Sequence, residues 1–410
     1  MERAQVQDHD TGGLPAYLHL DEKTKRAMFG ADPRWTRLVL DASYLHGKAS
    51  VAERLATNRT CEIVLDLNVA ETAAPGRFAG KDKLPWANRD RPWTPEDFSR
   101  SRNDDLILSM AQFAAAHHVH TVLAPTHLLG GTGEPWLPVD ADGCRQLRAA
   151  LDRLGCAHVS IDYPVLAPLA RVREHAWRKQ VISALADLPF GQLWLRVGGF
   201  GLHEDKRAGI LVVALQDFQA LGRPIVLDMA GGFASLAVLA CGAVSAMGHG
   251  IAKGEKMDFS QWRKEPKADS SGGAPMASRA YLAQIDAFLK KDQLADLAGQ
   301  VTAQAMIDRH CQNFLRDRAA QLDNALSGSA EERAAAFVAD QRQRLWELEQ
   351  QIKRGEAPGL AATQLDKARQ RTKELIRGLE ETGATRFSAH AIPLLQRSHD
   401  ALQYPLDLQP

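Results

Sequence analysis

The feature that most constrains this chain is a repeated unit, in which a short apolar run is followed by a loop and then by a stretch with helical spacing. Seven runs rich in β-branched or apolar residues are predicted as strands: 37–41, 62–69, 120–126, 157–163, 192–197, 224–229 and 243–247. The stretches between them predict helices: 50–58, 104–117, 140–154, 176–188, 208–221 and 233–241. Glycine follows several of these helices directly, as at Gly155 and Gly222, where a left-handed terminal residue is favoured.

This alternation predicts an α/β fold built on a parallel sheet. Near-continuous apolar strands, such as 63–65 and 225–227, are typical of a sheet covered on both faces. A doubly wound open sheet usually carries a glycine-rich phosphate turn after its first strand, but 41–48 contains only Gly47. We therefore predict a (β/α)8 TIM-type barrel over 1–290. Its eighth strand is expected at 280–285, within a stretch that also fits a helix.

Two long loops and a helical extension complete the predicted organisation. The loops, 71–101 and 253–277, follow predicted strands, and loops of this length usually act as lids or binding loops or are disordered. Residues 291–410 show no strand pattern and form the predicted extension. Within it, two long helices at 331–354 and 362–382 predict an antiparallel hairpin (331–382), which either packs on the barrel or docks a protein or nucleic acid.

Composition disfavours several classes of protein. Lys plus Arg equals Asp plus Glu, at 50 each, which disfavours a uniformly basic nucleic-acid binder and leaves a local basic patch open. The longest apolar runs, such as 233–241, are shorter than the roughly 20 residues that span a bilayer. The polar segment 1–13 does not resemble a signal peptide, so we expect a cytoplasmic protein with no membrane partner. The five cysteines lack the spacing of a zinc site or a disulfide framework.

Polar residues stand near the predicted strand ends, which meet at one mouth in a barrel. The candidate catalytic residues are Asp41, Asp66, Asp162, Asp228 and His249. The candidate substrate-binding residues are Asn68, His127, Arg196, Gly198, Gly199, Gly231 and Gly232. Carboxylates that share a cavity raise one another's pKa, and an arginine keeps a neighbour ionised, which together suit acid–base catalysis. The alternative for each aspartate is structural, as a helix cap or an ion-pair partner.

The glycines and histidines leave further alternatives open. The clusters 198–201 and 231–232 either expose N–H groups that bind an anion or simply form sharp turns. Histidine and aspartate at strand ends can hold a divalent metal, but no His-x-His follows the first predicted strand, where only His46 stands near Asp41. We therefore assign no metal ligands and leave the cofactor unknown.

Three segments resemble tRNA-guanine transglycosylases in the order of their elements: 195–201 (LRVGGFG), 223–231 (RPIVLDMAG) and 243–248 (AVSAMG). That superfamily consists of TIM-barrel enzymes that exchange a base in nucleic acid through an aspartate nucleophile. The resemblance covers 157–250 and implies that Gly198 and Gly199 contact a base, and that Asp162 recognises it. Gly248 and His249 stand where the family has its nucleophile, and the family's C-terminal Cys/His zinc cluster is not matched. A mouth shaped for a nucleobase or another small planar ligand is what the resemblance implies.

Three functions follow from these features. The first is a transglycosylase-like transferase, or a degenerate enzyme, that binds a nucleobase or nucleic acid at the mouth, with arginines and tryptophans of 71–101 contacting phosphates and bases. The second is a non-catalytic barrel that docks into a multiprotein assembly through its hairpin. The third is a metal-assisted hydrolase or lyase.

Overall fold

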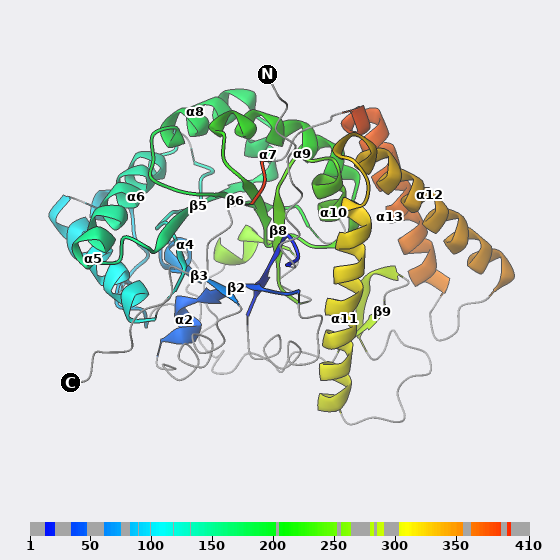
Figure 1. The fold of residues 1–410 in the computed structure, drawn as a ribbon, viewed down its shortest axis with the longest axis horizontal. Coiled ribbons are helices and arrows are strands. Elements are labelled where there is room, and N and C mark those ends of the chain that lie inside the picture. Colours follow the sequence, from blue (N-terminus) through cyan, green and yellow to red (C-terminus); the bar gives the residue numbers. More distant parts are fainter. Residues whose placement is uncertain are drawn as a thin grey trace, which may run out of the picture.

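The computed structural model describes residues 13–394 with internal gaps, the longest of which are 21–33, 47–60, 264–278 and 291–302. Eight parallel strands close into a barrel in the order of the sequence, and helices surround it (Figure 1). The strands are β1 (Ala16–His19), β2 (Arg37–Asp41), β3 (Glu62–Asp66), β4 (Thr121–Leu123), β5 (Ser160–Pro168), β6 (Leu193–Gly198), β7 (Ile225–Asp228) and β8 (Ala246–His249). The predicted (β/α)8 TIM-type barrel with a helical extension is confirmed.

The strand that completes the barrel differs from the prediction. β1 lies near the N-terminus, where it pairs in parallel with both β2 and β8 and so closes the sheet. The assignment of 280–285 as the eighth strand is wrong. That region contains β9 (Arg279–Leu282), which pairs antiparallel with β10 (Ala287–Lys290) in a separate two-stranded sheet. The turn between them contains Asp286 with a left-handed backbone (φ 46°), which ends any continuous strand or helix across it.

Side chains alternate between the inside and the outside of the barrel along each strand, and this alternation determines which polar residues line the mouth. Seven inward-facing residues fill the barrel as a packed layer: Tyr17, Val39, Val64, Leu123, Trp194, Val226 and Ala246. Two residues further toward the C-terminal end, the next inward positions on five of these strands are His19, Asp41, Asp66, Arg196 and Asp228. The layer of charged and titratable side chains therefore stands directly on an apolar floor.

The longer helices on the outside of the barrel are α5 (Arg100–Ala116), α6 (Trp136–Arg153), α8 (His175–Leu185), α9 (Ala208–Leu215), α10 (Gly232–Ala240) and α11 (Ala303–Leu326). Short helices follow three strands: α2 (Ala42–Leu45), α4 (Val69–Thr72) and α7 (Leu169–Val172). α11 packs against α10 and so continues the outer ring beyond the predicted domain boundary at residue 290. The predicted helix 50–58 lies outside the described residues. No helix in the described part of the chain is long and apolar enough to cross a membrane.

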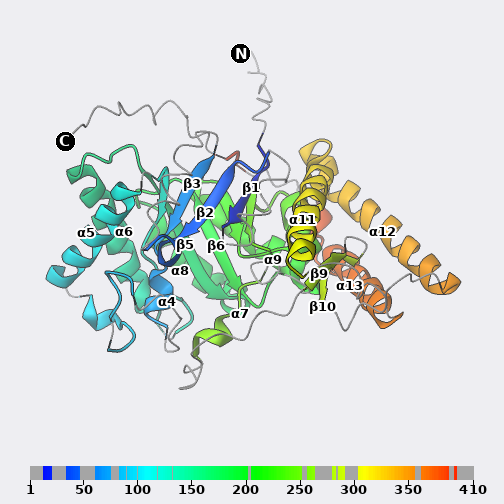
Figure 2. The same ribbon diagram turned by 90° about the horizontal axis from the view of Figure 1, so that it is seen from below.

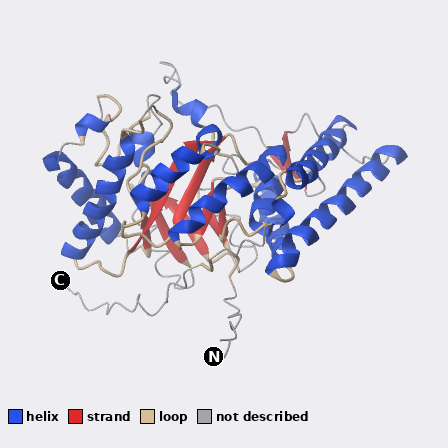
Figure 3. Ribbon diagram, turned by 90° about the horizontal axis from the view of Figure 1, so that it is seen from above, coloured by secondary structure: helices blue, strands red, loops and turns tan. Residues whose placement is uncertain are grey.

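The predicted helical hairpin is present as α12 (Ala330–Arg354) and α13 (Ala362–Glu381) (Figure 3). Ser329 and Glu332 form a capping box at the start of α12, and Gly355 ends it in the left-handed conformation. α13 packs on α9 of the barrel at a point of close backbone approach, because a Cβ atom at Gly209 would overlap the carbonyl oxygen of Gly378. The hairpin is thus joined to the outer ring of the barrel.

Candidate functional site

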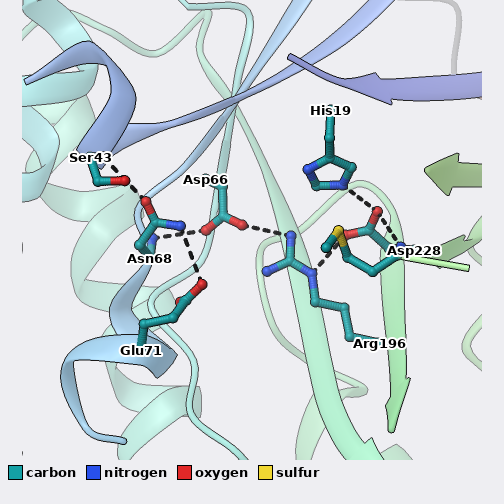
Figure 4. Close-up of polar contacts among 8 residues, drawn as sticks. His19, Ser43, Asp66, Asn68, Glu71, Arg196 and Asp228 are labelled. Atoms are coloured by element: carbon teal, nitrogen blue, oxygen red, sulfur yellow. Dashed lines mark hydrogen bonds and ion pairs between the residues drawn. The ribbon is translucent and has the colours of Figure 1, made fainter. Parts of the chain in front are cut away.

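The polar network at the mouth centres on Arg196 of β6, whose guanidinium joins two carboxylates (Figure 4). Its Nη2 lies 2.7 Å from Oδ2 of Asp66, and its Nε donates to Oδ2 of Asp228 at 2.6 Å. All three side chains are at most 9% exposed. Burial opposes the charge of Arg196, but Asp66 and Asp228 raise its pKa above the ordinary value. Arg196 is therefore the fixed cation between strands β3 and β7.

His19 of β1 extends this network toward the point where β1 pairs with β8 and closes the barrel. Its Nε2 lies 2.7 Å from Oδ1 of Asp228, and its other ring nitrogen points away from that carboxylate (Figure 4). The His19 side chain is 14% exposed, whereas the Asp228 side chain is completely buried. Burial alone would lower the pKa of His19, but Asp228, with a smaller contribution from Asp41, raises it above the ordinary value. His19 is thus a partly accessible imidazole whose protonated form is favoured.

Asp228 is held as an anion. Burial alone would raise its pKa, but His19 and Arg196 hold that pKa well below its usual range. The backbone N–H of Met229 also donates to Oδ1 at 2.9 Å. A Cβ atom at Gly248 would overlap Oδ1, so only glycine on the neighbouring strand leaves room for this carboxylate. With both oxygens engaged, Asp228 is suited to orienting His19 rather than to attacking a substrate.

Asp66 is fixed by the turn that follows β3. The backbone N–H of Asn68 donates to Oδ1 of Asp66 at 2.8 Å. Asn68 has a left-handed backbone (φ 54°), and its side-chain oxygen accepts the N–H of Ser43 at 3.3 Å (Figure 4). Met229, directly after Asp228, is also left-handed (φ 52°). Non-glycine residues in this conformation are uncommon and cluster at functional sites, so the two mouth aspartates are each followed by a strained turn.

An apolar segment lies over one side of the mouth. It contains Met257 and the turn η5 (Phe259–Arg263), and its side chains Met257, Phe259 and Trp262 pack with Leu166 of β5. A Cβ atom at Gly198 would overlap the ring of Phe259, so only glycine at this position leaves room for the ring. Figure 2 shows the turn, in light green, at one end of the strands. Part of the predicted loop 253–277 therefore covers the mouth, while the rest of that loop lies outside the described residues.

Two of the predicted catalytic residues lie away from the mouth in the structure, and the first is Asp162. The predicted strand 157–163 ends at residue 163, but β5 continues to Pro168 and pairs with β6. Asp162 therefore lies near the beginning of β5, inside the barrel. Its carboxylate accepts hydrogen bonds from the backbone N–H of Gln192 (3.0 Å) and the indole of Trp194 (3.0 Å). The prediction of Asp162 at the mouth is wrong, and with it the position expected for base recognition.

The second misplaced residue is His249. It follows the inward-facing Gly248 and so faces outward, where its ring packs edge-on against Trp35 (5.2 Å) and Phe314 (6.0 Å). Burial lowers its pKa to about 3, so the ring stays neutral near pH 7. The prediction of His249 as a catalytic residue of the mouth is wrong. The sequence analysis missed His19, because no strand was predicted at 16–19, where β1 has only four residues.

The remaining predicted binding residues have contacts outside the Arg196 network. His127 is anchored to α6 instead of the Arg196 network, with Nδ1 2.6 Å from Oδ1 of Asp140 and its ring stacked on Trp136 at 3.6 Å. The carbonyl of Gly199 accepts from Arg207 at 2.7 Å. Gly231 and Gly232 stand at the beginning of α10, as its cap and its first residue.

The tryptophans of the predicted loop 71–101 are buried. The Trp86 indole donates to the carbonyl of Leu67 at 3.0 Å, and the Trp93 indole to the carbonyl of Trp86 at 2.9 Å. Their rings therefore stabilise the loop and do not offer faces on which bases can stack.

Comparisons add no family to this description. Searches against protein-family models and against curated proteins find no match to the chain. Among the residues that the structure describes, no three His, Cys, Asp or Glu side chains gather as a set of metal ligands.

Proposed function

We propose that the barrel mouth is an acid–base catalytic site for a small polar ligand, with His19 as the group that transfers the proton. The observation that carries this proposal is the chain of contacts from His19 through Asp228 and Arg196 to Asp66. A buried aspartate that fixes one nitrogen of an imidazole leaves the other nitrogen oriented for a ligand, which is the arrangement that general acid–base catalysis requires. The mouth lies at the C-terminal ends of the strands, where barrel enzymes place their sites.

The surroundings favour a flat, polar ligand such as a nucleobase. Arg196 and Asp66 offer a charged floor with donors and acceptors, and Phe259 and Trp262 supply an apolar cover for a ring. This class agrees with the one that the resemblance to tRNA-guanine transglycosylases implies. The segment around Phe259 crosses part of the mouth, which favours a free base or nucleoside over a nucleic-acid chain. Because Asp228 is held by two cations, proton transfer is favoured over covalent base exchange.

The test is a ligand panel with a matched pair of histidine variants. Purines, pyrimidines and their nucleosides are added to the wild-type protein, and binding is followed by thermal unfolding and calorimetry, with product analysis by chromatography. His19→Gln should abolish turnover of the responding ligand while binding changes less. His175→Gln, at an exposed outer-ring histidine paired with Asp217, should leave both unchanged. Equal turnover by wild type and His19→Gln would refute the catalytic role.

A second function, docking into a protein assembly, is favoured by one observation on the hairpin. Trp346 of α12 is 54% exposed, and a groove between α12 and α13 is lined by Ile376 and by Leu345, the residue before Trp346 in the sequence. Exposed tryptophan is typical of interface anchors. The two functions are separated by complementation in the source cell, because an assembly component keeps its function after His19→Gln and loses it after Trp346→Glu. A catalyst shows the reverse.

A further inference from the structure

The helix α12 has a largely exposed outward face whose residues repeat with the spacing of a coiled coil. α12 lies at the edge of the molecule, on the side of the barrel opposite α5 (Figures 1 and 2). Its other side is buried against the rest of the protein through residues such as Phe337 and Leu348. The residues of the outward face follow one another at alternating intervals of four and three positions, which lines them up for a second helix. They are Glu332, Ala336, Ala339, Gln343, Trp346, Gln350 and Lys353.

The sizes of these side chains fit one arrangement of two such helices. Trp346 is the largest and is 54% exposed, and the smallest are Ala336 and Ala339. When two copies of α12 run antiparallel about a point between residues 339 and 343, Trp346 of each copy faces Ala336 of the other, and Ala339 faces Gln343. In a parallel pair each residue faces its own copy, so the two indoles collide and the alanines leave gaps. Overpacking and cavities both destabilise a contact, so size favours the antiparallel pair.

The charges at the two ends of α12 favour the same arrangement. Glu331 and Glu332 lie in its first turn, and Lys353 and Arg354 lie in its last turn. In the antiparallel pair the acidic start of one helix lies beside the basic end of the other, with Lys353 displaced by about 4.5 Å along the axis from Glu332 of the second copy. A parallel pair places like charges together at both ends. Complementary charge of this kind fixes the orientation of a contact more than its strength.

From this complementarity in size and charge we propose that the outward face of α12 binds the same face of a second copy of the chain. The contact is antiparallel and self-complementary, as a twofold dimer requires. Trp346 of each copy is its anchor, because a buried indole removes a large apolar area from water. One helix face is smaller than the about 800 Å² per partner of a standard interface, so the dimer is weak and depends on concentration. The proposal names the partner for the docking function of the hairpin and rests on that function, but it is independent of the role of His19.

The test is analytical ultracentrifugation of the full chain over a series of concentrations. The average mass of the wild type should rise from 45.0 kDa toward twice that value as concentration increases. Trp346→Glu should weaken the association at least tenfold, about 1.4 kcal/mol, because it removes the anchor and places a charge in the contact. The matched control is Leu154→Glu, at a 38% exposed leucine at the end of α6, which should associate as the wild type does.

A second variant, Lys353→Glu, reverses the charge at one end of the outward face. The wild-type dimer should weaken as salt is added, because salt screens the attraction between the acidic and basic ends. Lys353→Glu should associate more weakly than the wild type at low salt, and its association should strengthen as salt screens the repulsion that replaces this attraction. Loss of packing alone does not reverse the direction of a salt dependence. Trp346 and Lys353 are both exposed, so both variants should fold.

A wild-type chain that stays at 45.0 kDa at every concentration would overturn the proposal. A dimer that Trp346→Glu does not weaken, or a Lys353→Glu variant with the salt dependence of the wild type, would overturn it as well. Complementation in the source cell tests the docking function separately. If Trp346→Glu loses function there although the purified wild type is monomeric, the partner of the hairpin is a different protein, and the docking function stands without self-association.

Discussion

Replacing Arg196 with methionine tests whether the ion-pair chain organises the mouth. The substitution keeps most of the side-chain volume but removes the cation that lies 2.7 Å from Asp66 and 2.6 Å from Asp228. Removing one partner of a buried ion pair typically costs about 3–5 kcal/mol, because the remaining charge has lost its compensation. Asp228 keeps His19 as a partner, whereas among the described contacts Asp66 keeps the backbone N–H of Asn68. We therefore expect Arg196→Met to lower the free energy of unfolding by about 3–5 kcal/mol at pH 7.

The assay is urea unfolding followed by tryptophan fluorescence, repeated from pH 7 to pH 4. In the wild type, the pKa of Asp228 is depressed, so its stabilising contribution is present above the unfolded pKa and is lost only as pH falls through the lower folded value. Without Arg196 the pKa of Asp228 rises, and protonation near pH 4 relieves the uncompensated charge. The difference between wild type and variant should therefore shrink as pH falls.

Arg377→Met is the matched control for this prediction, since it breaks an exposed pair with Glu381 and should cost under about 0.5 kcal/mol. A cost for Arg196→Met no larger than that of Arg377→Met, or a difference that grows toward pH 4, would refute the reasoning.

Three further predictions concern single residues of the barrel. Gly248→Ala should destabilise the protein by about 1–3 kcal/mol, because the added Cβ overlaps Asp228 and must displace it. Gly131→Ala, where the added Cβ makes only an ordinary van der Waals contact with Pro135, should be near neutral in the same thermal melt. The pKa of His19 is raised, so its contribution to folding stability is fully present below the unfolded pKa of about 6.5 and is lost as pH rises through the folded value. The difference in stability between wild type and His19→Gln should therefore decrease with rising pH. NMR titration of the His19 imidazole in Asp228→Asn should show a pKa lower than in the wild type. The pKa of His249 is lowered to about 3, so protonation of this histidine in the unfolded chain lowers the stability of the fold as pH falls from about 6.5 toward 3. His249→Leu should remove that part of the acid sensitivity and leave ligand binding at the mouth unchanged. A loss of ligand binding would contradict the outward position of this ring.

The barrel could be predicted because strand–helix alternation extends over most of the chain, while the site could be predicted only where strand ends were correctly read. β3, β6 and β7 end close to the predicted residues, so Asp66, Arg196 and Asp228 were found. Asp162 failed because the predicted strand stopped at residue 163, whereas β5 continues to Pro168 and pairs with β6 there.

His19 and His249 show a second limit of the sequence. β1 has only four residues, AYLH, too few for its alternation to stand out, so the pattern does not reveal the imidazole that it carries. At the end of β8, the inward or outward direction of His249 depends on a shift of one residue, which composition does not specify.

The contact between His19 and Asp228 joins positions 209 residues apart, on either side of the seam where β1 meets β8. The ribosome therefore synthesises the imidazole well before its carboxylate partner. Arg196 is likewise synthesised after Asp66, and a carboxylate buried without its guanidinium partner is less stable than one in water. The proposed proton-transfer site is assembled from both sides of this closing seam, so its activity would report directly on whether the ring of strands is complete.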